Sequence, residues 1–396
     1  MNILFLTLQY DSKKEKEYLE KSKMGLQGAA NTFQNNLLAG FKNLNDNVYV
    51  MNTLPVATFP RYNQILMKTQ KGNILDFPTT EIGYINLPVL KQATRYLAYK
   101  KQVKKWIKNT KGEKCIIAYS LYLPFEKLFK YIKKKYPSVK TSLICPDLPC
   151  EFGILPKNKI RAKLQTMVGR KALKYAKYVD TFTLLTEEMK HPLNVGDRPY
   201  TVVEGVCNTE AIKEVLPPKT KAILYTGTIN KKFGILTLLK AFSLLEDPSA
   251  ELWICGGGDS APQIKEAALK DSRIKFFGYV TKDEVLKLQS EAFMLINPRP
   301  NDGEYTKYSF PSKTMEYMLS GKPVLMYKLY GIPSEYDKFL YYISGNTPED
   351  MKNAICEVFT QDINDLISRS NAAANFVAKN KNSAVSAKKI QSIITE

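Results

Sequence analysis

The residues best suited to chemistry in this chain follow a short apolar run. Residues 293–297 (FMLIN) have the composition of a buried parallel strand, and prolines and a glycine break the chain after them. Pro311 then suits the first turn of a helix, and Gly321 suits its end. The stretch therefore predicts a strand, a loop and a helix N-terminus, an arrangement that favours anion binding at the carboxyl edge of a parallel sheet.

Charged and hydroxyl side chains gather where this helix begins. Arg299 lies in the loop, Ser312 and Lys313 lie in the first turn, and Glu316 follows on the same face as Lys313. Cations and free N–H groups hold phosphates, and a carboxylate accepts hydrogen bonds from two neighbouring ribose hydroxyls. We therefore expect a nucleotide diphosphate here. The alternative is a solvated helix with an incidental Lys313–Glu316 pair.

The string SFPSKTMEYMLSGKPV (309–324), with NPRP before it, resembles the nucleotide-binding segment of GT-B glycosyltransferases, especially the large retaining family usually numbered four. The resemblance implies an α/β protein with two Rossmann-like domains, whose parallel sheets face a central cleft. It also implies that Pro311, Ser312 and Lys313 line the donor site and that Glu316 binds the ribose. The family carries a second glutamate, and the matching position here is Tyr308, which we place on the donor side.

A second loop is expected at the donor site. Residues 222–226 predict a strand, 227–234 a loop and 235–245 a helix. In the resembled family this loop helps to neutralise the leaving diphosphate with a basic pair. Thr228 replaces one cation, Lys232 remains, and Arg299 is expected to supply the missing charge. The donor-side glycines expected from the resemblance are Gly227 and Gly257.

Fewer candidate residues stand in the first half. Gly28 lies in a glycine-containing loop between a strand (2–8) and a helix, which lets backbone approach a ligand, and in GT-B transferases this loop can touch the donor diphosphate. Asp147 and Tyr119 close two further strands, so we place them on the acceptor side. A solvated Asp147, and Ser120 in place of Tyr119, are the alternatives. The one histidine, His191, stands in a turn-like stretch, and we expect it to be structural.

Composition indicates a globular protein with two domains. The chain has 396 residues, alternating strand-like and helical segments, no run of 18 apolar residues and no basic region before its first strand. We expect domains at 1–212 and 213–375, with 215–221 as a linker, and a last helix (376–396) that in the resembled family often returns to the first domain. Residues 55–89 are expected to be irregular.

Metal and disulfide chemistry are not expected. The six cysteines are scattered without a CxxC pair, which argues against zinc and favours a reducing cytoplasm. Asp302 and Glu304 resemble a metal-binding pair only superficially, and we expect both to be solvated. We therefore predict no metal and no cofactor.

The net charge of +20 gives information about binding partners rather than about the fold. An anionic membrane, a diphosphate or nucleic acid would each account for it, as would a general lysine bias. Residues 90–114 are the most basic stretch and predict an amphipathic helix suited to a membrane interface. The alternative is a surface helix whose apolar stripe packs on a sheet.

We therefore predict a retaining hexosyltransferase. It would act in the cytoplasm or at the inner face of the cell membrane, and move a sugar from a nucleotide-sugar, UDP by default, to a saccharide or lipid-linked acceptor in cell-surface polysaccharide biosynthesis. A nucleotide-sugar epimerase of the same fold is an alternative, although such enzymes usually cluster carboxylates and histidines. A basic nucleic-acid- or membrane-binding protein without turnover is another, but no nucleic-acid-binding signature is visible.

Overall fold

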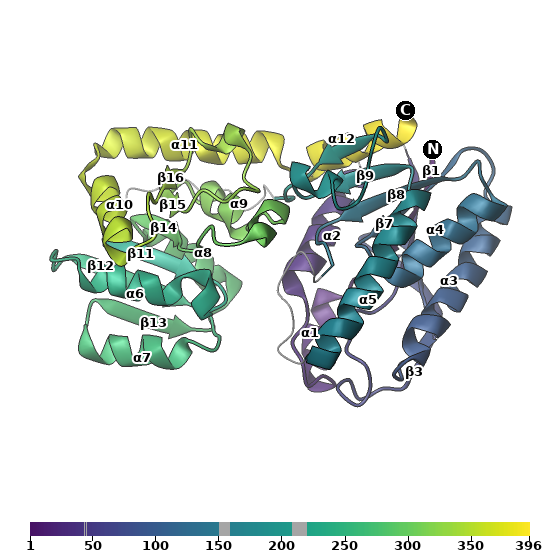
Figure 1. The fold of residues 1–396 in the computed structure, drawn as a ribbon, viewed down its shortest axis with the longest axis horizontal. Helices are drawn as coiled ribbons and strands as arrows, with labels where there is room; N and C mark the ends of the chain where they lie inside the picture. The colour runs from purple at the N-terminus through teal and green to yellow at the C-terminus, as the bar shows by residue number, and fades with distance from the viewer. Residues whose placement is uncertain (43, 45, 150–158, 208–219) are drawn as a thin grey trace. The chain divides into compact units, whose positions relative to one another are not determined.

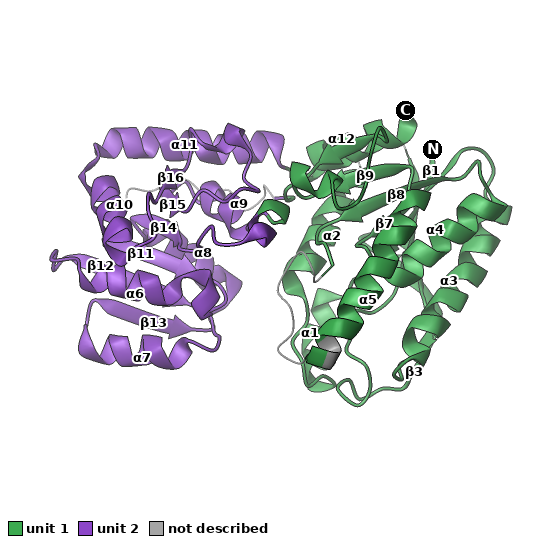
Figure 2. Ribbon diagram, viewed as in Figure 1, with its two compact units in different colours: residues 1–206, 307–309, 382–396 green, residues 207–306, 310–381 purple. Residues whose placement is uncertain are grey.

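The chain divides into two compact units, which are coloured separately in Figure 2. The computed structural model describes residues 1–396 except 43, 45, 150–158 and 208–219. Unit 1 comprises Met1–Val206, Lys307–Ser309 and Asn382–Glu396, and unit 2 comprises Cys207–Thr306 and Phe310–Lys381. The expected boundary at 212/213 and most of the expected linker lie outside the described residues.

Unit 1 is built on an eight-stranded sheet with the order β10-β9-β8-β7-β1-β2-β5-β4. Neighbouring strands pair in parallel, except for the antiparallel edge pair β4 and β5. The strands are β1 (Asn2–Thr7), β2 (Asn47–Asn52), β4 (Gln70–Ile74), β5 (Phe77–Glu81), β7 (Lys114–Tyr119), β8 (Lys140–Cys145), β9 (Thr181–Leu184) and β10 (Tyr200–Val202). A small separate sheet pairs β3 (Leu66–Met67) with β6 (Tyr84–Ile85).

Alternate side chains of the central strands enter two cores. Ile3 and Phe5 of β1 point into one cluster, and Leu4 and Leu6 point into the other, because successive side chains of a strand face opposite ways. Helices cover both faces (Figure 1). The faces are covered by α3 (Leu90–Asn109), α4 (Leu123–Lys135) and α5 (Lys159–Tyr175) on one side and by α2 (Gly28–Phe41) and α12 (Ser383–Thr395) on the other; α1 (Glu15–Glu20) is short. This is the α/β sandwich that the alternating pattern predicted.

The apolar stripe of the basic helix α3 packs on the sheet. Tyr99, Val103 and Ile107 are buried in the cluster shared with α4. The alternative interpretation of this stripe is therefore the correct one. Its lysines at 101, 104, 105 and 108 stay exposed.

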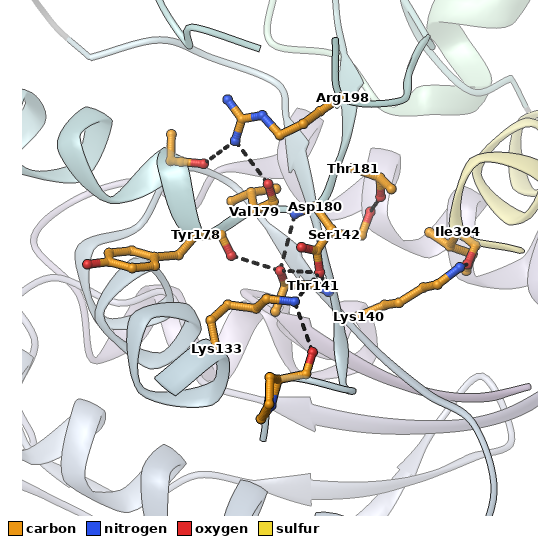
Figure 3. Close-up of polar contacts among 12 residues, drawn as sticks. Lys133, Lys140, Thr141, Ser142, Tyr178, Val179, Asp180, Thr181, Arg198 and Ile394 are labelled. Carbon is orange, nitrogen blue, oxygen red and sulfur yellow. Dashed lines mark hydrogen bonds and ion pairs between the residues drawn. The ribbon is translucent and has the colours of Figure 1, made fainter. Parts of the chain in front are cut away.

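The last helix, α12, packs against α2 within unit 1. At Gly40 of α2, an added Cβ would lie 2.0 Å from the carbonyl oxygen of Ser383, so only glycine permits this approach. Lys140 Nζ at the start of β8 donates to the Ile394 carbonyl at 3.0 Å. Figure 3 shows this contact beside the Asp180 carboxylate, which accepts from Lys133 Nζ at 2.8 Å. The bond from Lys140 ties the last helix to the sheet that begins with β1.

The expectation that 55–89 is irregular was wrong. This segment adds β4 and β5 to the sheet, joined by a tight turn in which Leu75 and Asp76 have positive φ. Pro78 misled the prediction because proline usually excludes a strand. It is tolerated because pairing of β5 with β2 begins only at the next residue, Thr79.

Unit 2 contains a six-stranded, wholly parallel sheet with the order β13-β12-β11-β14-β15-β16. Its strands are β11 (Lys221–Thr226), β12 (Ala250–Cys255), β13 (Ile274–Gly278), β14 (Met294–Asn297), β15 (Val324–Met326) and β16 (Tyr341–Tyr342). Its helices are α6 (Ile235–Ser243), α7 (Ala261–Lys270), α8 (Lys282–Glu291), α9 (Ser312–Leu319), α10 (Pro348–Thr360) and α11 (Ile363–Asn380). Each half is thus Rossmann-like, as predicted.

Candidate functional site

Two glycine loops meet backbone to backbone at the carboxyl edge of the sheet in unit 2. They follow β11 and β12, whose carboxyl ends share this edge because the strands are parallel. Gly256 has a φ of 128°, and a Cβ there would lie 1.9 Å from the Gly227 carbonyl oxygen. The Ile229 amide donates to the Gly257 carbonyl at 3.0 Å. Gly227, Gly256 and Gly257 therefore form a surface with little side-chain bulk, which we call the glycine floor.

The helix α9 begins at the same edge and is anchored by a buried hydroxyl. The Thr226 amide at the end of β11 donates to Tyr317 Oη at 2.8 Å, and Tyr317 Oη donates to the Thr226 carbonyl at 3.1 Å. Burial raises the pKa of Tyr317, so the hydroxyl keeps its proton. The anchor ties α9, which begins with Ser312 and Lys313 after the N-cap Pro311, to the end of β11, directly before Gly227.

Glu316 is held by two donors. Its carboxylate accepts from Lys313 Nζ at 2.9 and 3.0 Å, and from Gln289 Nε2 of α8 at 2.9 Å. The predicted shared face of Lys313 and Glu316 is confirmed, and the pair is about two-fifths exposed. Gln289 was not predicted, because only the packing of α8 brings this buried side chain to Glu316.

Two predicted cations approach the same aromatic ring. The Arg299 guanidinium lies 5.9 Å from the Phe233 ring centre and 5.0 Å from the Tyr305 ring centre. Lys232 Nζ lies 5.8 Å from the Phe233 ring centre. The loops that carry them touch at Gly234, where an added Cβ would lie 1.8 Å from the Pro298 carbonyl oxygen. The structure thus brings together the expected basic pair, Lys232 and Arg299, from loops 67 residues apart in sequence.

Other side chains shape the floor. Thr228 is exposed, and its carbonyl accepts from Tyr225 Oη at 2.8 Å. Asn230 caps the turn that carries Lys232 and donates to Asp259 Oδ2 at 3.0 Å. These bonds stabilise the loop between β11 and α6, and the Lys232 ammonium takes part in none of them.

Sequence reasoning missed Tyr279, a flat exposed ring at this edge. It follows β13, is 87% exposed, and lies so close to Gly257 that a Cβ on the glycine would meet the ring at 2.3 Å. The available signal was an aromatic residue directly after a strand that ends at the same edge as the glycine floor. An exposed aromatic face beside a phosphate-sized floor is suited to stacking on a base.

The remaining predicted residues belong to unit 1. Gly28 is the first residue of α2, and Asp147 is exposed after β8. Tyr119 is 4% exposed and packs on Phe33 in the core, so its side chain contributes to packing. Tyr308 is half-buried against the core of unit 1 and therefore belongs to a different unit from Glu316.

In the part of the chain that the structure describes, no three His, Cys, Asp or Glu side chains form a group that would hold a metal ion. Within the same residues, five cysteines are free thiols; Cys150 lies outside them.

The fold has clear relatives among solved structures. Sucrose-phosphate synthase from Thermosynechococcus elongatus superposes with a TM-score of 0.67 at 13% identity, covering 100% of this chain and 98% of that one. The lipopolysaccharide outer core galactosyltransferase WaaB superposes with a TM-score of 0.65 at 13% identity, covering 100% of this chain and 99% of that one. The Anabaena protein HepE in complex with UDP superposes with a TM-score of 0.65 at 12% identity, covering 100% of both chains. This is the GT-B fold of glycosyltransferases.

A comparison with protein families gives a match in the part of the chain that contains the candidate donor site. Residues 220–361 match the family described as glycosyl transferases group 1. No curated protein sequence matches the chain. The predicted GT-B architecture is therefore confirmed by the whole-chain superpositions, and the family match includes every predicted donor residue in unit 2.

Proposed function

We propose that this protein is a retaining hexosyltransferase that takes its sugar from a UDP-sugar. The observation that carries the proposal is the joint position of Arg299, Lys232 and the first turn of α9 at the glycine floor of unit 2. The match of 220–361 to glycosyl transferases group 1 supports the reaction class. Structural relatives with bound UDP and UDP-glucose support the choice of nucleotide.

The cations perform the electrostatic part of the reaction. When the bond between the anomeric carbon and the diphosphate oxygen breaks, negative charge grows on the diphosphate. Arg299 and Lys232, from two loops, and the N–H groups of the first turn of α9 stabilise that charge in place, without reorganisation. Ser312 and Lys313 bind the phosphates, and Gly227 and Gly257 let them approach the backbone.

The nucleoside binds beyond the phosphates. Glu316 accepts from the ribose hydroxyls, while Gln289 keeps the carboxylate oriented from behind. Tyr279 stacks on the uracil. The reaction uses no metal, since cations of the chain itself neutralise the diphosphate.

We assign the acceptor to unit 1. Asp147 follows the carboxyl end of β8, where open α/β sheets bind ligands, whereas Gly28, at the end of the loop after β1, is assigned to the donor diphosphate. The acceptor class is a saccharide or a lipid-linked saccharide, and the product is part of a cell-surface polysaccharide. Tyr308 stands at the sequence position of the family's first glutamate, but its side chain packs on the core of unit 1.

A membrane-facing layer fits a lipid-linked acceptor. The sequences of α3, α4 and α5 contain seven, five and six Lys or Arg and a single acid, Glu126, which is fully buried. Most of the net charge of +20 therefore resides in this layer. Leu97, Leu164 and Met167 are about 60% exposed among these cations, a combination that favours an anionic bilayer over nucleic acid. In the described residues, no helix is long and apolar enough to span a membrane.

Release of UDP from UDP-sugars tests the proposal. A panel of UDP- and GDP-sugars is first screened by thermal shift, because a bound ligand raises the unfolding midpoint. The stabilising donor is then incubated with candidate acceptors in the presence of EDTA, and free nucleotide and the anomeric configuration of the product are measured. We expect UDP release with retention. An inverted product would overturn the mechanism, and stabilisation by no nucleotide-sugar would overturn the function.

A further inference from the structure

Two cations of α3 are buried without a counter-charge. Lys91 and Arg95, one helical turn apart, are only 6% and 4% exposed. The Lys91 ammonium donates to the Val56 carbonyl. The Arg95 guanidinium donates to the Leu54 carbonyl at 2.7 Å and to Tyr122 Oη at 2.9 Å. All of these partners are neutral.

Such a pair is costly for the fold. A buried charge is normally compensated by an opposite charge, and neutral acceptors repay only part of its lost hydration. Burial, together with repulsion by Arg95, lowers the pKa of Lys91 to about 7. The Nε–H group of Arg95 is buried and has no hydrogen-bond partner. The two side chains thus have unused capacity for an anion.

The pair lies at the ligand-binding edge of unit 1. Leu54 and Val56 follow the carboxyl end of β2, and Tyr122 follows that of β7. The helix that carries both cations follows the N-cap residue Val89, whose φ of 65° is rare for a β-branched residue. Strain of this kind concentrates at functional sites.

The surroundings of Arg95 suit a phosphate. Its planar guanidinium lies over the Tyr84 ring at 3.9 Å, which fixes its orientation. Tyr122 Oη donates to Gln92 Oε1, and Gln92 is exposed, so the hydroxyl stands between the buried cation and solvent. Guanidinium, ammonium and phenol together form a donor set that matches a phosphate dianion.

We propose that Lys91 and Arg95, with Tyr122, bind a phosphate or diphosphate group that replaces the carbonyls of Leu54 and Val56. For the phosphate to bind, the loop after β2 must move, because its carbonyls accept hydrogen bonds from both cations. That this phosphate belongs to the sugar acceptor rests on the proposed function. The binding of the phosphate itself does not.

The first test uses the sign of a stability change. Lys91→Met removes the charge and keeps the length of the side chain. If the cation is kept for a ligand, this variant should unfold several degrees higher than the wild type and lose at least tenfold in affinity for inorganic pyrophosphate. Lys104→Met, on the exposed face of the same helix, is the matched control and should change the affinity less than twofold. A lower unfolding midpoint with unchanged affinity for pyrophosphate would show that Lys91 only stabilises the loop after β2, and would overturn the proposal.

Pyrophosphate also suits unit 2, so every protein carries Lys313→Ala as background. Calorimetric titration should then give one site, lost in Lys91→Met and in Arg95→Met. Persistence of that site in both variants would overturn the proposal. Because this readout needs no turnover, a failed transferase assay with intact pyrophosphate binding would reject the proposed function and leave the phosphate site standing.

A last comparison separates two sources of the phosphate. Glucose 6-phosphate represents a soluble sugar phosphate, and farnesyl diphosphate represents a lipid-linked diphosphate. We expect farnesyl diphosphate to bind at least tenfold more tightly, with the difference abolished by Arg95→Met. Tighter binding of glucose 6-phosphate, lost in the same variant, would support the phosphate site with a soluble acceptor. Binding of neither probe would overturn the proposal.

Discussion

Single residues at the glycine floor have separable roles, and Arg299 is the most sharply testable. In the proposed mechanism it faces the diphosphate, where charge grows only as the bond breaks. Arg299→Ala should therefore lower kcat, with about 2–4 kcal/mol added to the barrier, by analogy with the loss of one oxyanion donor. Lysine at 299 should rescue only part of this, because it lacks the two-pronged planar geometry. Steady-state kinetics, with unfolding midpoints as a control for folding, check both variants. A wild-type kcat in folded Arg299→Ala would leave Lys232 and Lys313 as the candidates for stabilising the charge on the diphosphate.

Glu316 should behave differently from Arg299. In the proposed mechanism Glu316 binds the ribose, whose hydroxyls change little during the reaction, so its contribution should be mostly uniform binding. Glu316→Gln should raise KM for the donor more than it lowers kcat. The half-exposed pair with Lys313 adds little stability, so the variant should remain folded. A fall in kcat at unchanged KM would show that Glu316 acts on the reacting centre.

Glu126 sets a pH dependence of stability. It is fully buried, and burial raises its pKa well above the usual value. The native state therefore keeps a proton that the unfolded chain releases above about pH 4.3, so the unfolding free energy falls as pH rises from there. Glu126→Met should remove this decline and exceed the wild type by more than about 1 kcal/mol at pH 8. Denaturant unfolding at pH 4.5, 6 and 8 checks it, and parallel curves for the two proteins would contradict the prediction.

At the scale of elements, the position of α9 depends on one hydroxyl. Tyr317→Phe leaves the amide and carbonyl of Thr226 without their buried partner. The loss should cost about 1–3 kcal/mol of stability and raise KM for the donor, because the first turn of α9 is no longer held at the floor. Tyr330→Phe, at a tyrosine that is 65% exposed, is the matched control and should have little effect on either. Equal midpoints for the two variants would show that packing alone places the helix.

Local signals identified several elements correctly. Residues 281–284 (TKDE) have the local pattern of a capping box, and the box is present at the start of α8, with Thr281 and Glu284 each bonding the other's backbone amide. Thr281 and Glu284 are near in sequence, so no tertiary contact is needed to form it. The two strands of the hairpin β4–β5 were missed because the pairing of β5 with β2 joins distant residues and outweighs the proline signal.

At the scale of the whole molecule, the layer formed by α3, α4 and α5 should bind anionic bilayers. Each engaged basic residue contributes about 1 kcal/mol near an anionic surface. The change Lys104→Gln/Lys105→Gln/Lys108→Gln should weaken binding to anionic vesicles in co-sedimentation, and high salt should weaken binding of the wild type. Three exposed lysines of unit 2, changed to glutamine at 265, 282 and 287, provide the control. Equal losses for both sets, or equal binding to neutral vesicles, would contradict a specific basic face.

The sequence by itself determined the α/β class, most strands and helices, and the candidate donor residues of unit 2. These follow from short-range patterns: period, proline and glycine positions, and charges within one helical turn. Arg299, Lys232 and the first turn of α9 lie at strand ends, and parallel strands bring their carboxyl ends to one edge.

Only the tertiary structure decided which side chains are buried and which unit holds them. Charge and spacing placed Lys91 and Arg95 among solvated lysines, yet loops from β2 and β7 enclose them. Tyr119 is in the core, Tyr308 belongs to unit 1, Gln289 contacts Glu316, and Tyr279 lies beside Gly257. Each of these outcomes depends on contacts between segments far apart in the chain. A local pattern contains no information about such contacts, because burial is a property of the packed fold.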